Sequence, residues 1–172
     1  RRTKESISHE EFYRAADALV KVKKVYIIGA GSSLAIATFL SYYFSLVFDS
    51  VQFISATSEA QILQQMVHIG EGDALIGISF PRYSMRTMKA LEFANSRKAK
   101  VITITDSVHS PMNVYAACTL IAKSDMASIV DSLVAPLSVI NALVVALCMK
   151  RQADVKKTLG KSAAKGAAAT AA

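Results

Sequence analysis

Two short segments of the chain carry the residue types that hold a phosphate group. Gly29-Ala30-Gly31-Ser32-Ser33 follows one short apolar run, and Ser79-Phe80-Pro81-Arg82-Tyr83-Ser84 follows another. Glycines let a backbone approach a ligand closely, serine hydroxyls donate hydrogen bonds, and an arginine can place two N–H donors on two phosphate oxygens. A third apolar run ends in Thr105-Asp106-Ser107. We therefore predict a site for a phosphorylated small molecule, with Gly31, Ser32, Ser33, Ser79, Arg82, Ser84 and Ser107 as its candidate residues.

Each of these features also has an ordinary structural explanation, and the sequence alone leaves both open. The glycine-rich segment could be only a tight turn, and Ser79 and Ser84 could be helix caps. Arg82 could be a solvated surface side chain. Two better-known phosphate motifs are excluded. Leu34 stands where a dinucleotide fingerprint needs its third glycine, and no Gly-Lys-Ser/Thr follows at P-loop spacing.

The sequence offers few candidate residues for acid–base catalysis or metal binding. The three histidines, His9, His68 and His109, are far apart and match no metal-ligand spacing. Glu59 fits the first turn of a helix and Glu71 fits a turn. No nucleophile elbow is visible. We expect no metal, no cofactor and no catalytic residue.

Short apolar runs alternate with helical patterns and must position the candidate loops. Strands are predicted at 24–28, 51–54, 74–78, 100–105 and 118–122. Helices are predicted at 8–22 with Ser8 as N-cap, from the first loop to about 47, and at 58–67, 84–97 and 131–151. This alternation, with strands that are continuously apolar, indicates an α/β domain whose parallel sheet has helices on both faces. Ligands bind such sheets beyond the carboxyl ends of the strands, which places the three loops at one edge.

Length and composition indicate one globular domain. The chain has 172 residues, of which 52% are hydrophobic and 19% charged. We expect residues 1–155 to form the domain and residues 156–172 to be a low-complexity, alanine-rich tail with little to pack.

No membrane segment or secretion signal is expected. The longest apolar stretch, Val134 to Met149, is shorter than the roughly 18 residues of a membrane span and contains Pro136, so it predicts a buried helix. The N-terminus has no apolar signal segment. Cys118 and Cys148 lack ligand spacing, as expected for reduced thiols in a cytoplasmic protein.

The net charge of +7 is concentrated at the two ends of the chain. Arg1, Arg2 and Lys4 lie at one end, and basic residues from Lys150 onward lie at the other. No basic stripe with interleaved aromatic residues crosses the body of the domain. Direct nucleic-acid binding by this chain is therefore not expected.

At these loops the sequence resembles the SIS (sugar isomerase) domain, and most closely the phosphosugar-binding domain that forms the C-terminal half of RpiR-type bacterial transcriptional regulators. The resemblance covers about Ser8 to Lys150. It depends on four segments together: Val25 to Ser33, Ala74 to Ser79, Val101 to Ser107 with Ser110-Pro111 after it, and Asp131 to Leu137.

The resemblance implies a three-layer, flavodoxin-like fold with a five-stranded parallel sheet of order 2-1-3-4-5, a homodimer formed through helices, and a sugar phosphate ligand. It implies that Ser33 is the phosphate-binding serine of the first loop. In the family's Ser-x-Ser-Gly-x-Thr loop, Ser79 matches the first serine and Ser84 stands at the threonine. Pro81 replaces the second serine and Arg82 the glycine, so a hydroxyl is lost and a guanidinium gained. Ser107 is a candidate for the sugar side.

The function implied is that of a phosphosugar sensor whose helix-turn-helix domain is absent from this chain, so that DNA is reached only through that missing domain. The alternative is a sugar-phosphate isomerase. Isomerases of this family place a Glu or His near the start of the late helices, whereas residues 123–141 contain neither and offer only Asp125 and Asp131. A third possibility is an interaction module with a vestigial pocket.

Overall fold

The computed structural model, which describes residues 9–123 and 132–170, contains one sheet of five parallel strands. The strands are β1 (Val25–Gly29), β2 (Val51–Ile54), β3 (Ala74–Ile78), β4 (Lys100–Thr105) and β5 (Cys118–Ile121). Their order is β2-β1-β3-β4-β5, and every neighbouring pair is parallel. The predicted α/β fold and strand order are confirmed.

Six helices surround the sheet in the described part of the chain. They are α1 (His9–Leu19), α2 (Ser33–Val47), α3 (Glu59–Gln65), α4 (Met85–Ser96), the 3₁₀ helix η2 (Pro111–Tyr115) and α5 (Val134–Thr170). Two predicted helix starts, the N-cap Ser8 and Asp131, lie outside the described residues.

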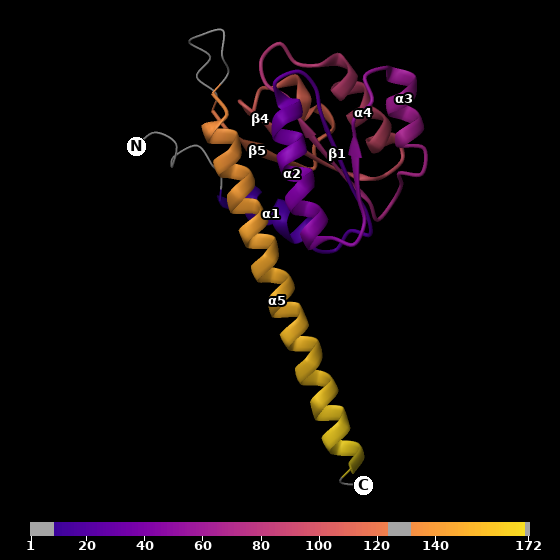
Figure 1. Ribbon diagram of the computed structural model, residues 1–172, viewed down its shortest axis with the longest axis vertical. Coiled ribbons are helices and arrows are strands. Elements are labelled where there is room, and N and C mark those ends of the chain that lie inside the picture. The colour runs from indigo at the N-terminus through magenta and orange to yellow at the C-terminus, as the bar shows by residue number, and fades with distance from the viewer. Residues whose placement is uncertain (1–8, 124–131, 171–172) are drawn as a thin grey trace.

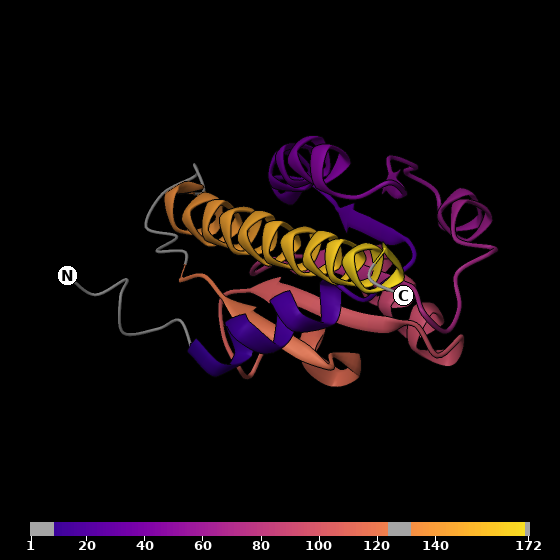
Figure 2. The ribbon, with the colours of Figure 1, turned by 90° about the horizontal axis from the view of Figure 1, so that it is seen from below.

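The helices form two layers, with the sheet between them (Figures 1 and 2). Residues of α1, α2 and α5 share one hydrophobic core with the sheet, and residues of α3, α4 and η2 share the other. All five residues of β1 and of β3 are buried. Strands covered on both faces must be apolar on both, which explains why their sequence runs do not alternate.

Helix α5 is longer than the sequence patterns predict. It does not end near Arg151 but continues to Thr170 and projects beyond the sheet (Figure 1). Alanine and lysine are strong helix formers, and no proline follows Pro136, so nothing in this stretch terminates the helix. The single Gly160 costs only about 1 kcal/mol.

The first turns of α5 contribute one face to the core, whereas the sequence predicts a buried helix. Among the described residues, the segment 134–153 is the one helix long and apolar enough to cross a membrane by length and composition. It packs against α1 and α2, and Val139, Ile140, Leu143 and Leu147 are buried there. These residues account for one face of the segment only, since 28% of it is buried and Val145 and Met149 are exposed.

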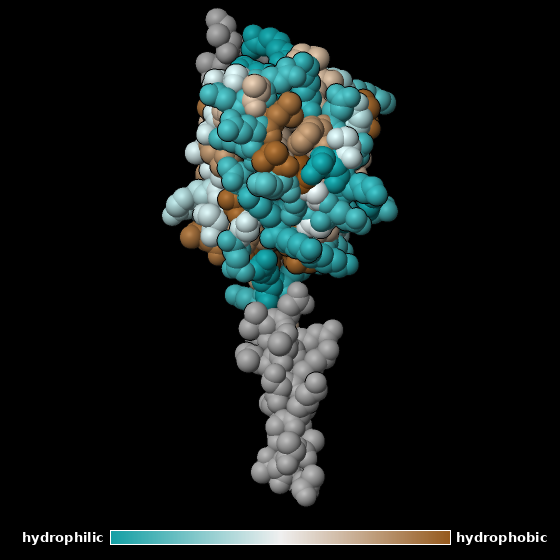
Figure 3. All heavy atoms as spheres, turned by 90° about the vertical axis from the view of Figure 1, so that its right-hand side faces the viewer, coloured by the Kyte–Doolittle hydropathy of each residue, from teal (hydrophilic) through white to brown (hydrophobic). Residues whose placement is uncertain are grey.

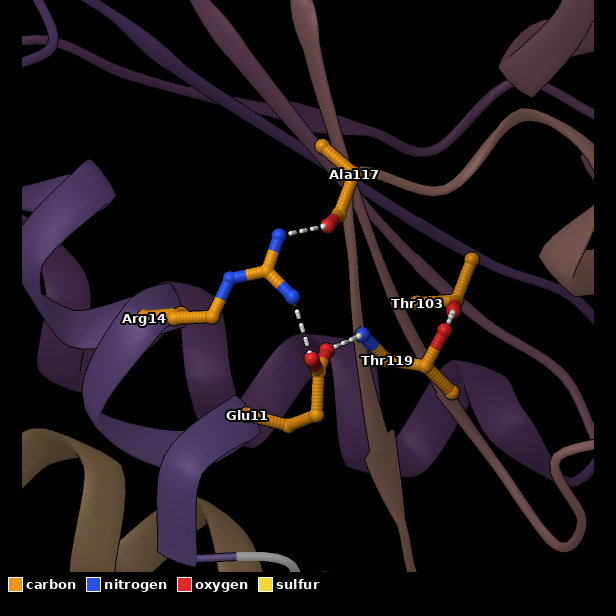
Figure 4. A network of polar contacts seen from close by, with 5 residues as sticks. All are labelled: Glu11, Arg14, Thr103, Ala117 and Thr119. Carbon is orange, nitrogen blue, oxygen red and sulfur yellow. Dashed lines mark hydrogen bonds and ion pairs between the residues drawn. The ribbon is translucent and has the colours of Figure 1, made fainter.

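Helix α1 covers the outer edge of β5 (Figure 4). An edge strand presents unpaired backbone groups. Glu11 Oε2 accepts a hydrogen bond from the Thr119 N–H at 3.0 Å, and the Arg14 guanidinium donates to the Ala117 carbonyl at 3.1 Å. Glu11 and Arg14 also form an ion pair. The helix therefore satisfies backbone groups that the sheet leaves open.

Candidate ligand site

A cavity of about 210 Å³ lies between the carboxyl ends of β1 and β3. Strand order reverses at this point, because β1 pairs with β2 on one side and with β3 on the other. The cavity is lined by residues 30–33 after β1, and by residues 79–82 with Ser84 after β3. Six of the seven predicted site residues line it together: Gly31, Ser32, Ser33, Ser79, Arg82 and Ser84.

The loop after β1 makes a close turn into α2. Gly31 has φ +61°, a conformation that favours glycine. A Cβ on Gly29 would lie 2.6 Å from the Ser33 carbonyl oxygen, so only glycine lets α2 begin this close to the strand. Ser32 is the N-cap residue but makes no side-chain capping bond. The positive end of the α2 dipole therefore meets the cavity, and the Ser32 hydroxyl is not engaged in capping.

The loop after β3 is held by its own serines. The Ser79 hydroxyl oxygen, in a side chain that is almost fully buried, accepts from the Ser84 N–H at 3.1 Å. The Ser84 hydroxyl oxygen accepts from the Thr87 N–H at 3.3 Å and so caps α4. Capping is thus an observed role of Ser84. Because a hydroxyl that accepts a bond still carries a proton to donate, capping and ligand binding are compatible.

Arg82, which stands where the resembled SIS loop has a glycine, adopts a backbone conformation that favours glycine. Its φ is +68°, in the left-handed region that costs a non-glycine residue about 1–2 kcal/mol. Its side chain is exposed at the cavity. The guanidinium has no hydrogen bond or ion pair with any residue that the structure describes. The loop therefore presents, at the rim of the cavity, a cationic group without a partner among the described residues.

Tyr83 and Asp106 connect this loop to the end of β4, and sequence reasoning missed both. The Tyr83 hydroxyl donates to Asp106 Oδ1 at 2.7 Å, and the Thr105 hydroxyl donates to the same oxygen at 3.2 Å. Burial, and then the hydrogen bond to Asp106, raise the pKa of Tyr83 above its ordinary value. Tyr83 thus stays a protonated donor that fixes the loop beside Arg82.

Ser107 is not among the residues that line the cavity. Its hydroxyl oxygen accepts from the His109 N–H at 3.1 Å, and its carbonyl accepts from the Asn113 side chain at 3.0 Å. Ser107 directly follows Asp106 in the loop after β4. A ligand contact by Ser107 remains a prediction.

A larger cavity, about 600 Å³, lies at the opposite end of the sheet and holds none of the predicted site residues. Arg14, Lys21 and Lys100 line it together with Asp17 and Asp73. With Lys98 and Glu71, the lining holds four basic and three acidic side chains, so the mixed charges leave an excess of a single positive charge. Over residues 9–123 and 132–170, no three His, Cys, Asp or Glu side chains gather as metal ligands would.

The fold and the site define an open α/β domain with a hydroxyl- and arginine-lined cavity at its topological switch point. The SIS domain family model matches residues 18–146. The chain belongs to the SIS domain family, as its loops predict.

The chain is similar to regulators and to isomerases. It is 26% identical, over 89% of its length, to an uncharacterized HTH-type transcriptional regulator of Caldanaerobacter subterraneus subsp. tengcongensis, and it spans about half (55%) of that relative. The fold matches the sugar isomerase domain of an RpiR transcription factor from Sphaerobacter thermophilus, with TM-score 0.81 and 23% identity, covering 93% of this chain and 89% of that one.

Two further solved structures share the fold at lower identity. The Vibrio vulnificus NanR protein, complexed with ManNAc-6P, matches with TM-score 0.74 and 17% identity over 94% of this chain and 61% of that chain. Phosphoheptose isomerase GmhA of Neisseria gonorrhoeae matches with TM-score 0.69 and 17% identity over 85% and 92%. The fold alone therefore does not separate sensor from enzyme.

Proposed function

We propose that this chain is the phosphosugar-binding effector domain, formed by residues 1–155, of a cytoplasmic RpiR-type transcriptional regulator. The cavity that gathers Gly31, Ser33, Ser79, Arg82 and Ser84 carries the proposal, because it joins a helix N-terminus, hydroxyls and a free guanidinium around one space. DNA would be contacted by a helix-turn-helix domain outside these 172 residues. The ligand would act by binding one arrangement of the regulator more tightly than another.

A sensor is favoured over an isomerase by the chemistry of the cavity. Aldose–ketose isomerisation needs a base to move a proton between adjacent carbons. The described residues that line the cavity include no Asp, Glu, His or Lys. Asp106 does not line the cavity, and it accepts hydrogen bonds from Tyr83 of the loop after β3 and from Thr105. Asp125 and Asp131, the remaining candidates, lie outside the described residues.

The proposal predicts binding without turnover. Titration calorimetry with a panel of hexose and pentose phosphates is expected to find at least one ligand, and the matching unphosphorylated sugars are expected not to bind. Coupled isomerase assays with the same panel are expected to show no product. A folded protein that binds no member of the panel would overturn the sensor function. Turnover that is lost in Asp131→Asn would favour the isomerase instead.

We also propose a homodimer through the outer face of α2 and α5, which pack side by side (Figure 2). Tyr42 and Leu46 on α2, and Val145 and Met149 on α5, are between 58% and 69% exposed. Arg151 lies over the Phe48 ring, 4.8 Å from its centroid. The C-terminal end of α2 therefore lies beside the part of α5 that carries Met149. Exposed apolar side chains gathered on one face are typical of an interface.

The dimer predicts a solution mass of twice 18.5 kDa by light scattering. Leu46→Asp is expected to shift the protein toward the monomer, because a carboxylate would be buried in the interface without a partner. The matched control is Val114→Asp, since Val114 is 72% exposed on η2, in the opposite helix layer. A monomeric unmodified protein, or equal effects of the two variants, would contradict this interface.

A further inference from the structure

A second, smaller cavity adjoins the candidate phosphate cavity. It measures about 90 Å³ and shares Ala30 and Gly31 with the first cavity as lining residues. Its other walls come from β1, the start of α2, β2 and the loop after it, α3 and the first turn of α4. It therefore opens on the other side of the glycine-rich loop. Apolar side chains are visible at the surface within the largely hydrophilic face that carries α3 and α4 (Figure 3).

The walls of this second cavity are mainly apolar. Ile28, Leu34, Ile54 and Ile62 line it. The one charged side chain there, Arg86, donates to the Thr57 carbonyl and is thereby engaged. Burying a sugar hydroxyl against such walls would cost free energy unless each hydrogen bond were replaced. A methyl group would instead gain from burial there.

A buried hydroxyl borders the same cavity. Thr87 is fully buried, and within the described residues its Oγ1 has no hydrogen-bond partner. Buried polar groups without partners are uncommon in native proteins. A carbonyl oxygen held in the cavity would give this hydroxyl an acceptor after a rotation about χ1. The second cavity thus combines walls for a methyl group with a donor for a carbonyl.

We propose that this second cavity binds the N-acyl group of an amino-sugar phosphate whose phosphate occupies the first cavity. The proposal rests on the proposed function and narrows it to one class of ligand. Ala30 and Gly31 line both cavities, and no atom beyond the chain neighbours of Gly31 lies within 4 Å of where its Cβ would be, so in this proposal the ligand crosses the loop over Gly31. A space of about 90 Å³ suits a substituent of a few atoms, such as an acetamido group, and not a second ring.

The test compares matched pairs of ligands by calorimetry on the unmodified chain. The pairs are N-acetylglucosamine 6-phosphate against glucosamine and glucose 6-phosphates, and N-acetylmannosamine 6-phosphate against mannosamine and mannose 6-phosphates. At least one acetylated ligand is expected to bind about tenfold or more tightly than its two counterparts. Equal or weaker binding of both acetylated ligands, with a counterpart bound, would overturn this inference and leave the phosphosugar function standing. No binding of any phosphosugar would overturn both.

Two variants locate the effect in the second cavity. Ala56→Leu fills it and is expected to abolish the acetyl preference while glucose 6-phosphate affinity stays within twofold. Gln64→Leu, which places a leucine on the exposed surface of α3, is expected to change neither the acetyl preference nor the affinity for glucose 6-phosphate. A preference that survives Ala56→Leu in a folded protein would refute the assignment.

Thr87→Val removes the buried hydroxyl at nearly constant shape. It is expected to keep or raise the melting temperature, because that hydroxyl has no partner among the described residues. It is also expected to lower the affinity for the acetylated ligand about fivefold or more, and to leave the affinity for the unacetylated counterpart unchanged. Equal weakening of both ligands would show a merely structural role for Thr87 and contradict its assignment as a donor.

Discussion

Replacing Arg82 by glycine is expected to stabilise the protein and to weaken phosphosugar binding in the same variant. Arg82 has φ +68°, and glycine removes the cost of about 1–2 kcal/mol that a side chain incurs in this conformation. Loss of the guanidinium removes a charge-assisted hydrogen bond to the phosphate, which is worth about 1.5–3 kcal/mol, or roughly tenfold to more than a hundredfold in Kd. Urea denaturation and calorimetry measure the two effects separately.

Two further substitutions at Arg82 separate backbone from side chain. Arg82→Ala keeps the left-handed conformation under strain, so it is expected to lose affinity like the glycine variant without gaining stability. Arg82→Lys keeps the charge but loses the paired N–H donors of the guanidinium. Its phosphosugar affinity is therefore expected to lie between those of the unmodified protein and Arg82→Ala. Unchanged affinity in both the alanine and the glycine variants would reassign Arg82 to the solvated surface.

The Arg82 position shows what sequence reasoning can and cannot supply at this site. Residue types identify the loop, and the Pro81-Arg82 pair is visible as a departure from Ser-Gly. The backbone angle cannot be predicted from the residue types, because arginine rarely adopts a positive φ. From the sequence, the substitution indicates an altered loop. In the structure Arg82 adopts a positive φ, which glycine favours, and its side chain is exposed at the cavity.

The sheet and the grouping of the loops were predictable because both follow from local patterns and a general rule of topology. Each central strand is apolar on both faces, and its loop begins where the apolar run ends. Once the strands are parallel, their carboxyl ends share one edge, so Ser33, Ser79 and Arg82 meet without any pairwise signal in the sequence.

Contacts between distant segments were not predictable in this way. Tyr83 and Asp106 are 23 residues apart, and Glu11 and Thr119 are 108 apart. A tyrosine in a loop and a glutamate on an amphipathic helix each have many possible partners, and no spacing rule selects among them. The second cavity was missed for the same reason, because its walls come from four separate segments.

Gly29→Ala is expected to have the largest effect on stability of any substitution considered. A Cβ at this position would lie 2.6 Å from the Ser33 carbonyl oxygen and 3.0 Å from Ala37 Cβ, both in α2. A backbone atom cannot rotate away, so α2 must move off the sheet and disturb the buried contacts of Ile36 and Leu40. We expect a loss of about 3 kcal/mol or more in the free energy of unfolding.

Two other glycines provide matched controls for Gly29→Ala in the same urea denaturation series. At Gly77 the added Cβ meets the Leu91 Cδ2 atom at 2.6 Å, and a side-chain end can shift, so Gly77→Ala should cost less. At Gly70 the nearest atom is 3.9 Å away, so Gly70→Ala should be close to neutral. A Gly29→Ala protein as stable as Gly70→Ala would contradict the packing of α2 described here.

The two substitutions, Gly29→Ala and Arg82→Gly, act on the same cavity in opposite ways. Gly29 lets α2 pack on β1 and also sets where the positive end of that helix meets the cavity. Its replacement should therefore lower stability and phosphosugar affinity together. Arg82→Gly should separate them, raising stability while lowering affinity. The first outcome would show that the fold requires the glycine in the loop after β1. The second would show that the loop after β3 contributes to ligand binding through a residue that the fold does not require.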